Sequence, residues 1–194
     1  MSPKQSSKAQ KHEGNRQETK KSLKTLVLIR HAHRDVEDRS RDNGLSPRGR
    51  EQVQALLSYF KRSSKAPRVE KGVFDPERGE RTAWISSPKK RCLETLSPLA
   101  LIEGVRPTTI DLLLERGEDE ELQHFHHRVR EFCDWWLQEG PELTFACSHG
   151  DWIPACVEQL TGGKVQVSKG SWCELVISAE TGEPALRWLI QRFA

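Results

Sequence analysis

The chain has 194 residues, a length that corresponds to one domain or to one domain with an extension. Hydrophobic residues make up 35% and aromatic residues 7% of the sequence, which suffices for a buried core and excludes a chain that is disordered throughout. No uninterrupted apolar run exceeds four residues, against the roughly 20 that a helix needs to cross a bilayer. A membrane-spanning helix is therefore not expected.

The net charge of +3 is unevenly distributed. Residues 1–24 hold seven lysines and arginines against two glutamates, which leaves 24 basic and 26 acidic residues for 25–194. The first segment is rich in Ser, Gln and Lys, so it buries too little surface to offset the entropy of ordering it. We predict a disordered basic tail over 1–24 and one folded domain over 25–194. Charge alone would let the tail contact nucleic acid or an anionic membrane, but a solvated extension is favoured, and neither partner is expected.

The cysteines indicate a reducing compartment. There are five, an odd number, they are widely spaced, and none forms a C-x-x-C pair. This usage is typical of free buried thiols rather than of a disulfide framework or a zinc site. The start of the chain contains no signal-peptide apolar region, so we predict a cytoplasmic protein.

Short apolar runs and amphipathic helices alternate from residue 25 onwards. Thr25–Ile29 is a continuous β-type run, typical of a strand buried on both faces of a parallel sheet. Ser46-Pro47 supplies an N-cap and a first-turn proline for a helix, and apolar residues follow at helical spacing. A second strand is predicted over Thr82–Ser86, and Ser87-Pro88 predicts another capped helix start.

The second half of the chain continues this alternation. Thr109–Leu114 is predicted to be a strand and Glu120–Glu139 a helix that ends at a Gly-Pro pair. Leu143–Cys147 is predicted to be a fourth strand, followed by a helix near Trp152–Leu160.

The pattern predicts the fold class. Trp172–Ile177 and Ala185–Gln191 are separated by a turn and indicate a hairpin. Strands and helices alternate before it, so we predict an α/β fold, a three-layer sandwich with a mostly parallel central sheet. The connection Lys61–Arg81 is the one long irregular piece, and we interpret it as a functional rim or an insertion.

Polar residues gather directly after the predicted strands. Arg30 and His31 follow the first strand, Arg91 lies just after the second, Glu115 follows the third and His149 the fourth. Ligands of open parallel sheets bind at the carboxyl ends of the strands, so these side chains are predicted to converge at one edge of the sheet.

Together these residue types suit phosphoryl transfer. Arginines at 30 and 91 match the oxygens of a phosphate dianion in a bidentate fork, and a neutral imidazole such as His31 is a competent nucleophile. His149 can donate hydrogen bonds to the oxygens of the transition state, and Glu115, when protonated, can protonate the leaving oxygen. Neither a metal ion nor another cofactor is required.

Four segments resemble the motifs of a known family. Leu28–Ala32 is similar to the R-H-G signature of the histidine phosphatase (phosphoglycerate mutase-like) superfamily, and Leu45–Gln52 to its L-T-x-x-G-x-x-Q segment. Ser86–Thr95 resembles its S-S-P-x-x-R-x-x-Q-T element, and Ser148–Gly150 its second-histidine motif. Each motif alone is weak, but four in the family's order are specific and extend over most of the predicted domain.

The resemblance implies an α/β fold in which the first histidine is transiently phosphorylated and water then releases phosphate. Carried over by position, His31 would be the nucleophile, while Arg30, Arg91 and His149 would form the phosphate pocket. Glu115 matches the family's L-x-E proton donor.

Several assignments stay open. Glu118 is an alternative to Glu115 as general acid, and family members that act on phosphohistidine can lack this acid altogether. Ser46 is interpreted first as a helix cap and second as a contact to substrate. Arg34 and His33 either line the mouth of the pocket or belong to a basic surface loop.

Three departures from the family pattern bear on the activity. Ala32 replaces a glycine, which requires a backbone there without positive φ. Glu94 replaces a glutamine, a change interpreted as one on a helix surface. Only 13 residues separate Leu114 from Arg128, where phosphoglycerate mutases carry a large lid. A short lid admits water, so it favours phosphatase over mutase.

We therefore expect a metal-independent phosphatase that forms a phosphohistidine on the enzyme and acts on a phosphorylated small molecule or on a phosphohistidine protein. The alternatives are a phosphoglycerate-type mutase and a catalytically weak phosphate-binding module. His124 and His127 share a helix face, but the sequence offers them no acidic or cysteine partner at ligand spacing, so no metal site is predicted.

Overall fold

The computed structural model describes residues 24–38, 41–65, 82–178 and 180–193, with the side chains of 63–65 excepted. The predicted tail over 1–24 therefore lies outside the described residues except for Lys24. Its ammonium group donates to the carbonyl oxygens of Trp136 and Leu137, at 3.1 and 2.9 Å. No helix of the described ranges is long and apolar enough to cross a membrane.

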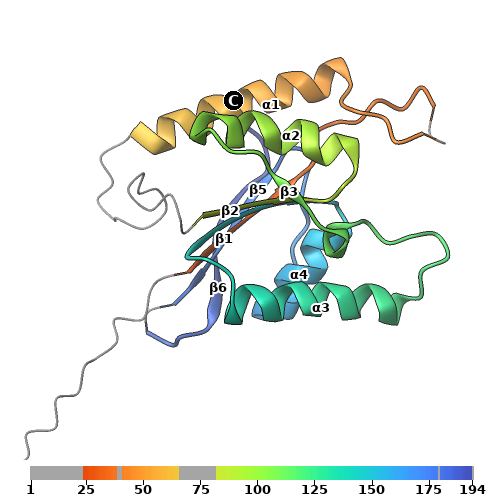
Figure 1. The fold of residues 1–194 in the computed structure, drawn as a ribbon. Helices are drawn as coiled ribbons and strands as arrows, with labels where there is room; N and C mark the ends of the chain where they lie inside the picture. Colours follow the sequence, from red (N-terminus) through yellow and green to blue (C-terminus); the bar gives the residue numbers. More distant parts are fainter. Residues whose placement is uncertain (1–23, 39–40, 66–81, 179, 194) are drawn as a thin grey trace, which may run out of the picture.

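A six-stranded sheet forms the centre of the molecule (Figure 1). Its spatial order is β3-β2-β4-β1-β5-β6. The strands are β1 (Thr25–Arg30), β2 (Thr82–Ser86), β3 (Thr108–Thr109), β4 (Leu143–Ser148), β5 (Trp172–Ile177) and β6 (Pro184–Ile190). The first four strands pair in parallel, whereas β5 runs antiparallel to both β1 and β6. The prediction of a mostly parallel sheet ending in a hairpin is thus confirmed.

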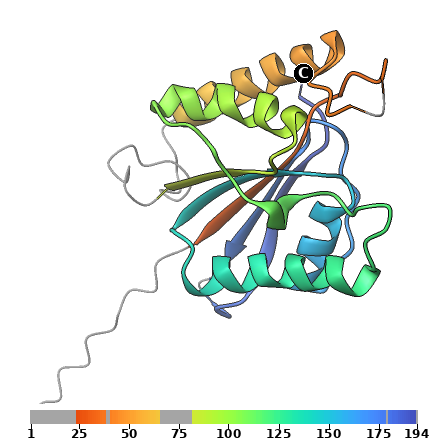
Figure 2. The same ribbon diagram turned by 45° about the vertical axis from the view of Figure 1, so that its right-hand side comes forward.

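Helices cover both faces of the sheet. α1 (Pro47–Lys65) and α2 (Lys90–Ala100) lie on one side, and α3 (Leu122–Gln138) and α4 (Trp152–Thr161) on the other, as the turned view in Figure 2 shows. This arrangement is the predicted three-layer sandwich.

Each face of the sheet has its own core because side chains alternate along a strand. Leu26 and Leu28 of β1 pack in the cluster that includes residues of α3 and α4. Val27 and Ile29 pack in the cluster with residues of α1 and α2. All four are fully buried, which explains why this strand is a continuous apolar run in the sequence.

The start of α1 agrees with the prediction and its end does not. The backbone N–H of Gly49 donates to the Ser46 hydroxyl at 3.1 Å, so Ser46 caps the helix as expected. The helix continues to Lys65. Residues 61–65 of the connection predicted to be irregular are therefore helical, and 66–81 lie outside the described residues.

Two other predictions need correction. α2 begins at Lys90 rather than at Pro88, because Lys89 is extended (φ −62°, ψ 132°) and forms the N-cap. Of the strand predicted over Thr109–Leu114, only Thr108–Thr109 pairs with β2, and Asp111–Leu113 forms a 3₁₀ helix. Leu113 is fully buried in the core beneath α3, so this apolar run reflects burial of a helical turn rather than of a strand.

Candidate active site

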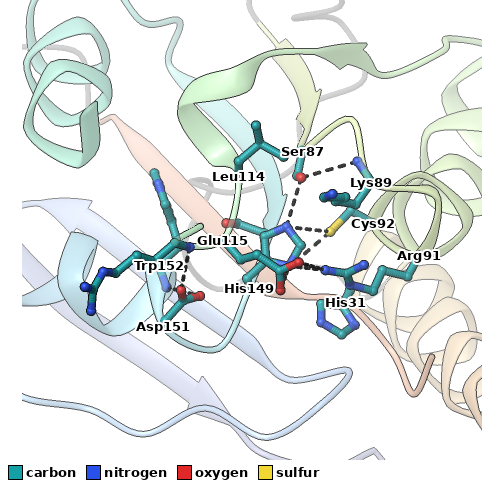
Figure 3. Close-up of polar contacts among 12 residues, drawn as sticks. His31, Ser87, Lys89, Arg91, Cys92, Leu114, Glu115, His149, Asp151 and Trp152 are labelled. Atoms are coloured by element: carbon teal, nitrogen blue, oxygen red, sulfur yellow. Dashed lines mark hydrogen bonds and ion pairs between the residues drawn. The ribbon is translucent and has the colours of Figure 1, made fainter. Parts of the chain in front are cut away.

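Two histidines meet where the parallel strands end. His31 directly follows β1, and His149 directly follows β4, the neighbouring strand. Their ring centroids lie 5.3 Å apart with the rings at 60° to each other (Figure 3). Both side chains are buried, with 5% and 1% of their surface exposed. The predicted convergence of the two strand ends thus brings both imidazoles to one place.

The position of the proton on His31 follows from its neighbour. Nδ1 lies 2.7 Å from the carbonyl oxygen of Ala32, and a carbonyl only accepts, so Nδ1 carries the proton and Nε2 keeps its lone pair. Burial, followed by His149 and then by the charges of Arg91 and Arg30, lowers the pKa of His31 to about 3, although the hydrogen bond to Ala32 raises it. His31 is therefore a neutral imidazole at physiological pH, with Nε2 available as a nucleophile.

His149 is held at one nitrogen and faces the site with the other. Its Nε2 lies 2.9 Å from the Ser87 hydroxyl and 3.6 Å from the thiol of Cys92. Its Nδ1 lies 3.4 Å from a guanidinium nitrogen of Arg91 and 3.6 Å from Glu115 Oε2. Burial and then the charge of Arg91 lower the pKa of His149 to about 3, so this ring is neutral as well.

The partner of Nδ1 sets the tautomer of His149. A hydroxyl both donates and accepts, so Ser87 can serve either state of Nε2. While Arg91 donates to Nδ1, Nε2–H donates to Ser87. When an oxygen replaces Arg91 beside Nδ1, Ser87 donates to Nε2 and Nδ1–H becomes a donor to that oxygen. His149 is thus suited to donate to an anion without becoming charged.

Both predicted arginines reach this place and have unsatisfied N–H groups. Arg91, at the start of α2, is 2% exposed, and Arg30 ends β1 half-buried. One terminal nitrogen of Arg30 donates to the Val167 carbonyl at 2.6 Å. The buried Nε of each guanidinium has no hydrogen-bond partner among the described residues. An unpaired buried donor is costly, so two of them beside two imidazoles indicate a place that accepts an anion.

Gly150 lets Arg30 occupy its position. A Cβ added to this glycine would lie 2.5 Å from the guanidinium carbon of Arg30. Only a residue without a side chain allows the guanidinium to lie against the backbone here, which explains the glycine after His149.

Glu115 occupies the mouth of the site. Its Oε1 forms an ion pair with Arg91, and its side chain is 40% exposed (Figure 3). Arg128 of α3 donates to the carbonyl oxygens of Leu114 and Glu115, and this fixes the segment after the 3₁₀ helix. Glu118 is exposed and lines the same cleft, but no contact of Glu118 with Arg91 or His149 occurs in the described structure. The geometry therefore brings Glu115 rather than Glu118 to the histidines.

The other sequence candidates lie at the edge of this place. Arg34 lines a cleft of about 760 Å³ together with Lys89 and Glu115. The Ser46 hydroxyl lies 2.9 Å from His33 Nδ1 and also caps α1, so its hydrogen bonds go to the chain itself. A contact of Ser46 with substrate stays a prediction.

Asp42 belongs to no motif, so the sequence analysis did not select it. Its Oδ2 accepts from the backbone N–H of Lys90 at 3.0 Å, and its Oδ1 lies 3.5 Å from Arg91. Lys89 provides no side-chain cap for α2, so a carboxylate from a distant loop caps the helix that carries Arg91. No local pattern in the sequence indicates such a contact.

Ala32 and Glu94 depart from the family pattern, and the structure agrees with the interpretation of Ala32 but not with that of Glu94. Ala32 has no positive φ, as expected, since no such residue other than glycine occurs in the described ranges. Glu94 is half-buried, and its Oε2 accepts from the backbone N–H of Leu45 at 2.6 Å. A Cβ on Gly44 would lie 2.3 Å from the same carboxylate. Glu94 thus fixes the loop that precedes α1, and its interpretation as a mere surface change was wrong.

No group of three or more His, Cys, Asp or Glu side chains in the described ranges is arranged to hold a metal ion. His124 and His127 lie on α3 and line a surface cleft with Arg130.

The fold is shared with known phosphatase structures. No family model and no curated protein matches the chain. Among solved structures, a protein named as an alpha-ribazole-5′-P phosphatase from Escherichia coli is 19% identical with a TM-score of 0.67, covering 88% of this chain and 97% of that one. A phosphoserine phosphatase from Entamoeba histolytica is 17% identical (TM-score 0.62, covering 86% and 96%). The protein histidine phosphatase SixA is 14% identical (TM-score 0.59, covering 86% and 96%).

These likenesses establish the fold of the chain at low sequence identity. It is the α/β fold that the resemblance to the histidine phosphatase superfamily implies.

Proposed function

We propose that the protein is a phosphatase that acts through a phosphohistidine on His31. The observation that carries this proposal is the meeting of a neutral imidazole, whose Nε2 has a lone pair, with two guanidiniums whose buried Nε–H groups have no partner. Such a set supplies a nucleophile and a cradle for a phosphate dianion. The arginines provide the positive charge, so the reaction needs no metal ion.

The first step transfers the phosphoryl group to the enzyme. Nε2 of His31 forms a bond to phosphorus while the bond from phosphorus to the ester oxygen breaks. Arg30 and Arg91 hold the equatorial oxygens, and His149 Nδ1–H donates to one of them as negative charge shifts. The leaving oxygen takes a proton from a carboxylic acid at the mouth, for which Glu115 is the candidate that geometry favours.

The second step releases phosphate. Water attacks the phosphorus, the bond between phosphorus and Nε2 breaks, and the Glu115 carboxylate accepts a proton from the water. The cleft in front of Glu115 is open and lined by charged side chains, including Arg34, Lys89 and Arg116. Open access of water favours hydrolysis over return of the phosphoryl group to a sugar acid, which is the step a mutase requires.

The substrate is proposed as a class. A phosphomonoester of a small molecule or a phosphohistidine on another protein presents the same terminal dianion to Arg30 and Arg91. Related folds include enzymes named for alpha-ribazole-5′-P, for phosphoserine and for protein phosphohistidine. A panel containing phosphorylated metabolites and one phosphohistidine protein, assayed with chelator present, separates these classes.

The proposal is tested by hydrolysis of an aryl phosphate in the presence of chelator. We expect His31→Ala to abolish turnover, a loss of about 10⁴-fold or more, because the covalent route is removed. His126→Ala, which removes an exposed imidazole, is the matched control and should retain full activity. Persistent turnover by the His31→Ala variant, or activity that requires a divalent metal, would remove His31 from the mechanism. Wild-type protein that binds phosphate but never turns over would favour the binding-module alternative.

A further inference from the structure

A second cleft, of about 650 Å³, lies beside the segment that follows His31. Neighbouring residues of this segment line different clefts, since Arg34 lines the cleft in front of Glu115 and His33 lines the second one. The walls of the second cleft come from the first turns of α1, from the loop before β5 and from the residues after β6. None of its lining residues is His31, Arg91, Glu115 or His149.

The charge in this second cleft is mainly positive. Arg48, Lys169 and Arg192 line it, against the single carboxylate of Glu51. His33 lines the cleft with Lys169 and Arg48, and burial and then the charges of these two residues lower the pKa of His33. Arg48 and Arg192 are exposed, and no hydrogen bond or ion pair of either guanidinium occurs within the described ranges. Two guanidiniums thus face one cleft, and within the described ranges neither is paired with a carboxylate.

One wall of the second cleft is apolar. The half-buried ring of Phe193 lines it together with Ala55, and this ring packs on Tyr59 with 4.8 Å between the centroids. A single phosphate ion fills only a small part of such a volume. The cleft therefore suits a molecule that carries an anionic group at one end and a flat or apolar body at the other.

Hydrogen bonds join this cleft to the strand end that carries His31. Gln52 accepts from the backbone N–H of His33 at 2.8 Å and donates to the Lys169 carbonyl at 3.2 Å. The N–H of Gly170 lies 3.1 and 3.2 Å from the carbonyl oxygens of Arg30 and His31. The walls that come from α1 and from the loop before β5 are thus held in place by the chain itself rather than by a ligand.

We propose that the second cleft is a binding site for a small organic phosphate, held by Arg48 and Arg192 with its ring against Phe193. A guanidinium fork matches phosphate oxygens, and both forks here are unengaged. The proposal does not depend on the proposed hydrolysis, because none of these residues belongs to the group around His31.

The test uses calorimetry with adenosine 5′-monophosphate, which carries a phosphate and a flat ring, on the His31→Ala variant so that no turnover occurs. The double variant Arg48→Ala/Arg192→Ala should lose one binding event. Each arginine removed is expected to weaken that event about tenfold. Adenosine, which lacks the phosphate, should not produce the event.

The control is Arg62→Ala/Arg130→Ala, which removes the same charge from exposed positions outside the second cleft. This control should bind like its parent. Equal isotherms for the two double variants would overturn the proposal, because binding would then follow net charge alone or occur elsewhere. With His31 intact, Arg48→Ala/Arg192→Ala should hydrolyse aryl phosphate within twofold of wild type. A larger loss would assign these arginines to the active site and overturn the second site, whatever the outcome for the His31 mechanism.

Discussion

The arginines of the candidate active site and those of the second cleft differ in their exposure and in their carboxylate partners. In the candidate active site, Arg91 is 2% exposed and contacts the carboxylates of Glu115 and Asp42. In the second cleft, Arg48 and Arg192 are exposed and have no such partner within the described ranges. A buried guanidinium loses its hydration and needs a counter-charge, whereas an exposed one keeps its water. An anion entering the active site must therefore replace Glu115, while an anion entering the second cleft displaces only water.

The largest expected effect is that of removing Arg91 from the candidate active site. Arg91→Ala removes a buried donor from the phosphoryl group, and we expect kcat/KM for an aryl phosphate to fall about a thousandfold. Arg48→Ala removes an exposed arginine of the second cleft and should change kcat/KM less than twofold. Equal losses in the two variants would show that the clefts do not differ as described. Partial recovery of Arg91→Ala by added guanidinium would show that the fold survives the substitution.

A second substitution separates the two functions of Glu115. If Glu115 is the general acid as proposed, Glu115→Gln should lower kcat about a hundredfold or more. The carboxylate that competes for Arg91 is lost too, so inorganic phosphate should inhibit at several-fold lower concentration. Steady-state kinetics with phosphate as product inhibitor measures both values. Glu118→Gln is the matched control, and a larger loss of kcat in Glu118→Gln would move the general acid to that residue.

The neutral histidines predict an unusual pH dependence. An imidazole with the ordinary pKa of about 6.5 is only a few per cent neutral at pH 5, which would slow attack about thirtyfold. Since the pKa of His31 is lowered to about 3, the rate of phosphoenzyme formation should change less than threefold between pH 7 and pH 5, after correction for ionisation of the substrate. Single-turnover rates test this, and a loss that follows a group of pKa near 6.5 would contradict it.

The same histidines affect stability with a definite sign. Their folded pKa values, about 3, lie below the value near 6.5 of an unfolded chain, so the unfolded state binds more protons between these limits. The contribution of these two histidines to the free energy of unfolding should be constant above about pH 6.5 and should decrease as the pH falls from 6.5 towards 3. Urea unfolding across this range measures the decrease.

The smallest expected effect concerns Asp42. Asp42→Ala removes the acceptor for Lys90 N–H, so the free energy of unfolding should fall by about 1 kcal/mol. Asp42→Asn keeps an acceptor oxygen and should lose less than half of that, because the carboxylate is 41% exposed and its pairing with Arg91 is screened. If Asp42→Asn lowers the free energy of unfolding as much as Asp42→Ala does, the ion pair with Arg91 contributes more to stability than the capping hydrogen bond.

Local patterns in the sequence predicted the parts of the fold that local physics decides. The apolar run over Thr25–Ile29 corresponds to β1, and the helix start predicted at Ser46-Pro47 corresponds to the start of α1. Burial on two faces and helix capping both determine which residue types occur at consecutive positions, so a local pattern can predict them. The positions of His31 and His149 after parallel strands predicted their meeting, because parallel strands end at the same edge.

The remaining features depend on distant contacts. Asp42 caps a helix from 48 residues away along the chain, and Glu94 binds the N–H of Leu45 across 49 residues. Neither contact has a local signature, so no inspection of neighbouring residues finds it. Leu113 belongs to an apolar run that suits a strand and a buried turn equally, and only packing beneath α3 decides between them.

Trapping the phosphoenzyme tests the central claim most directly. Protein mixed with a ³²P-labelled aryl phosphate is quenched in alkali within one turnover, digested, and the labelled peptide is sequenced. The account predicts an acid-labile, alkali-stable label on His31 that is absent from His31→Ala and accumulates when Glu115→Gln slows its hydrolysis. A label on another residue, or none during active turnover, would contradict it.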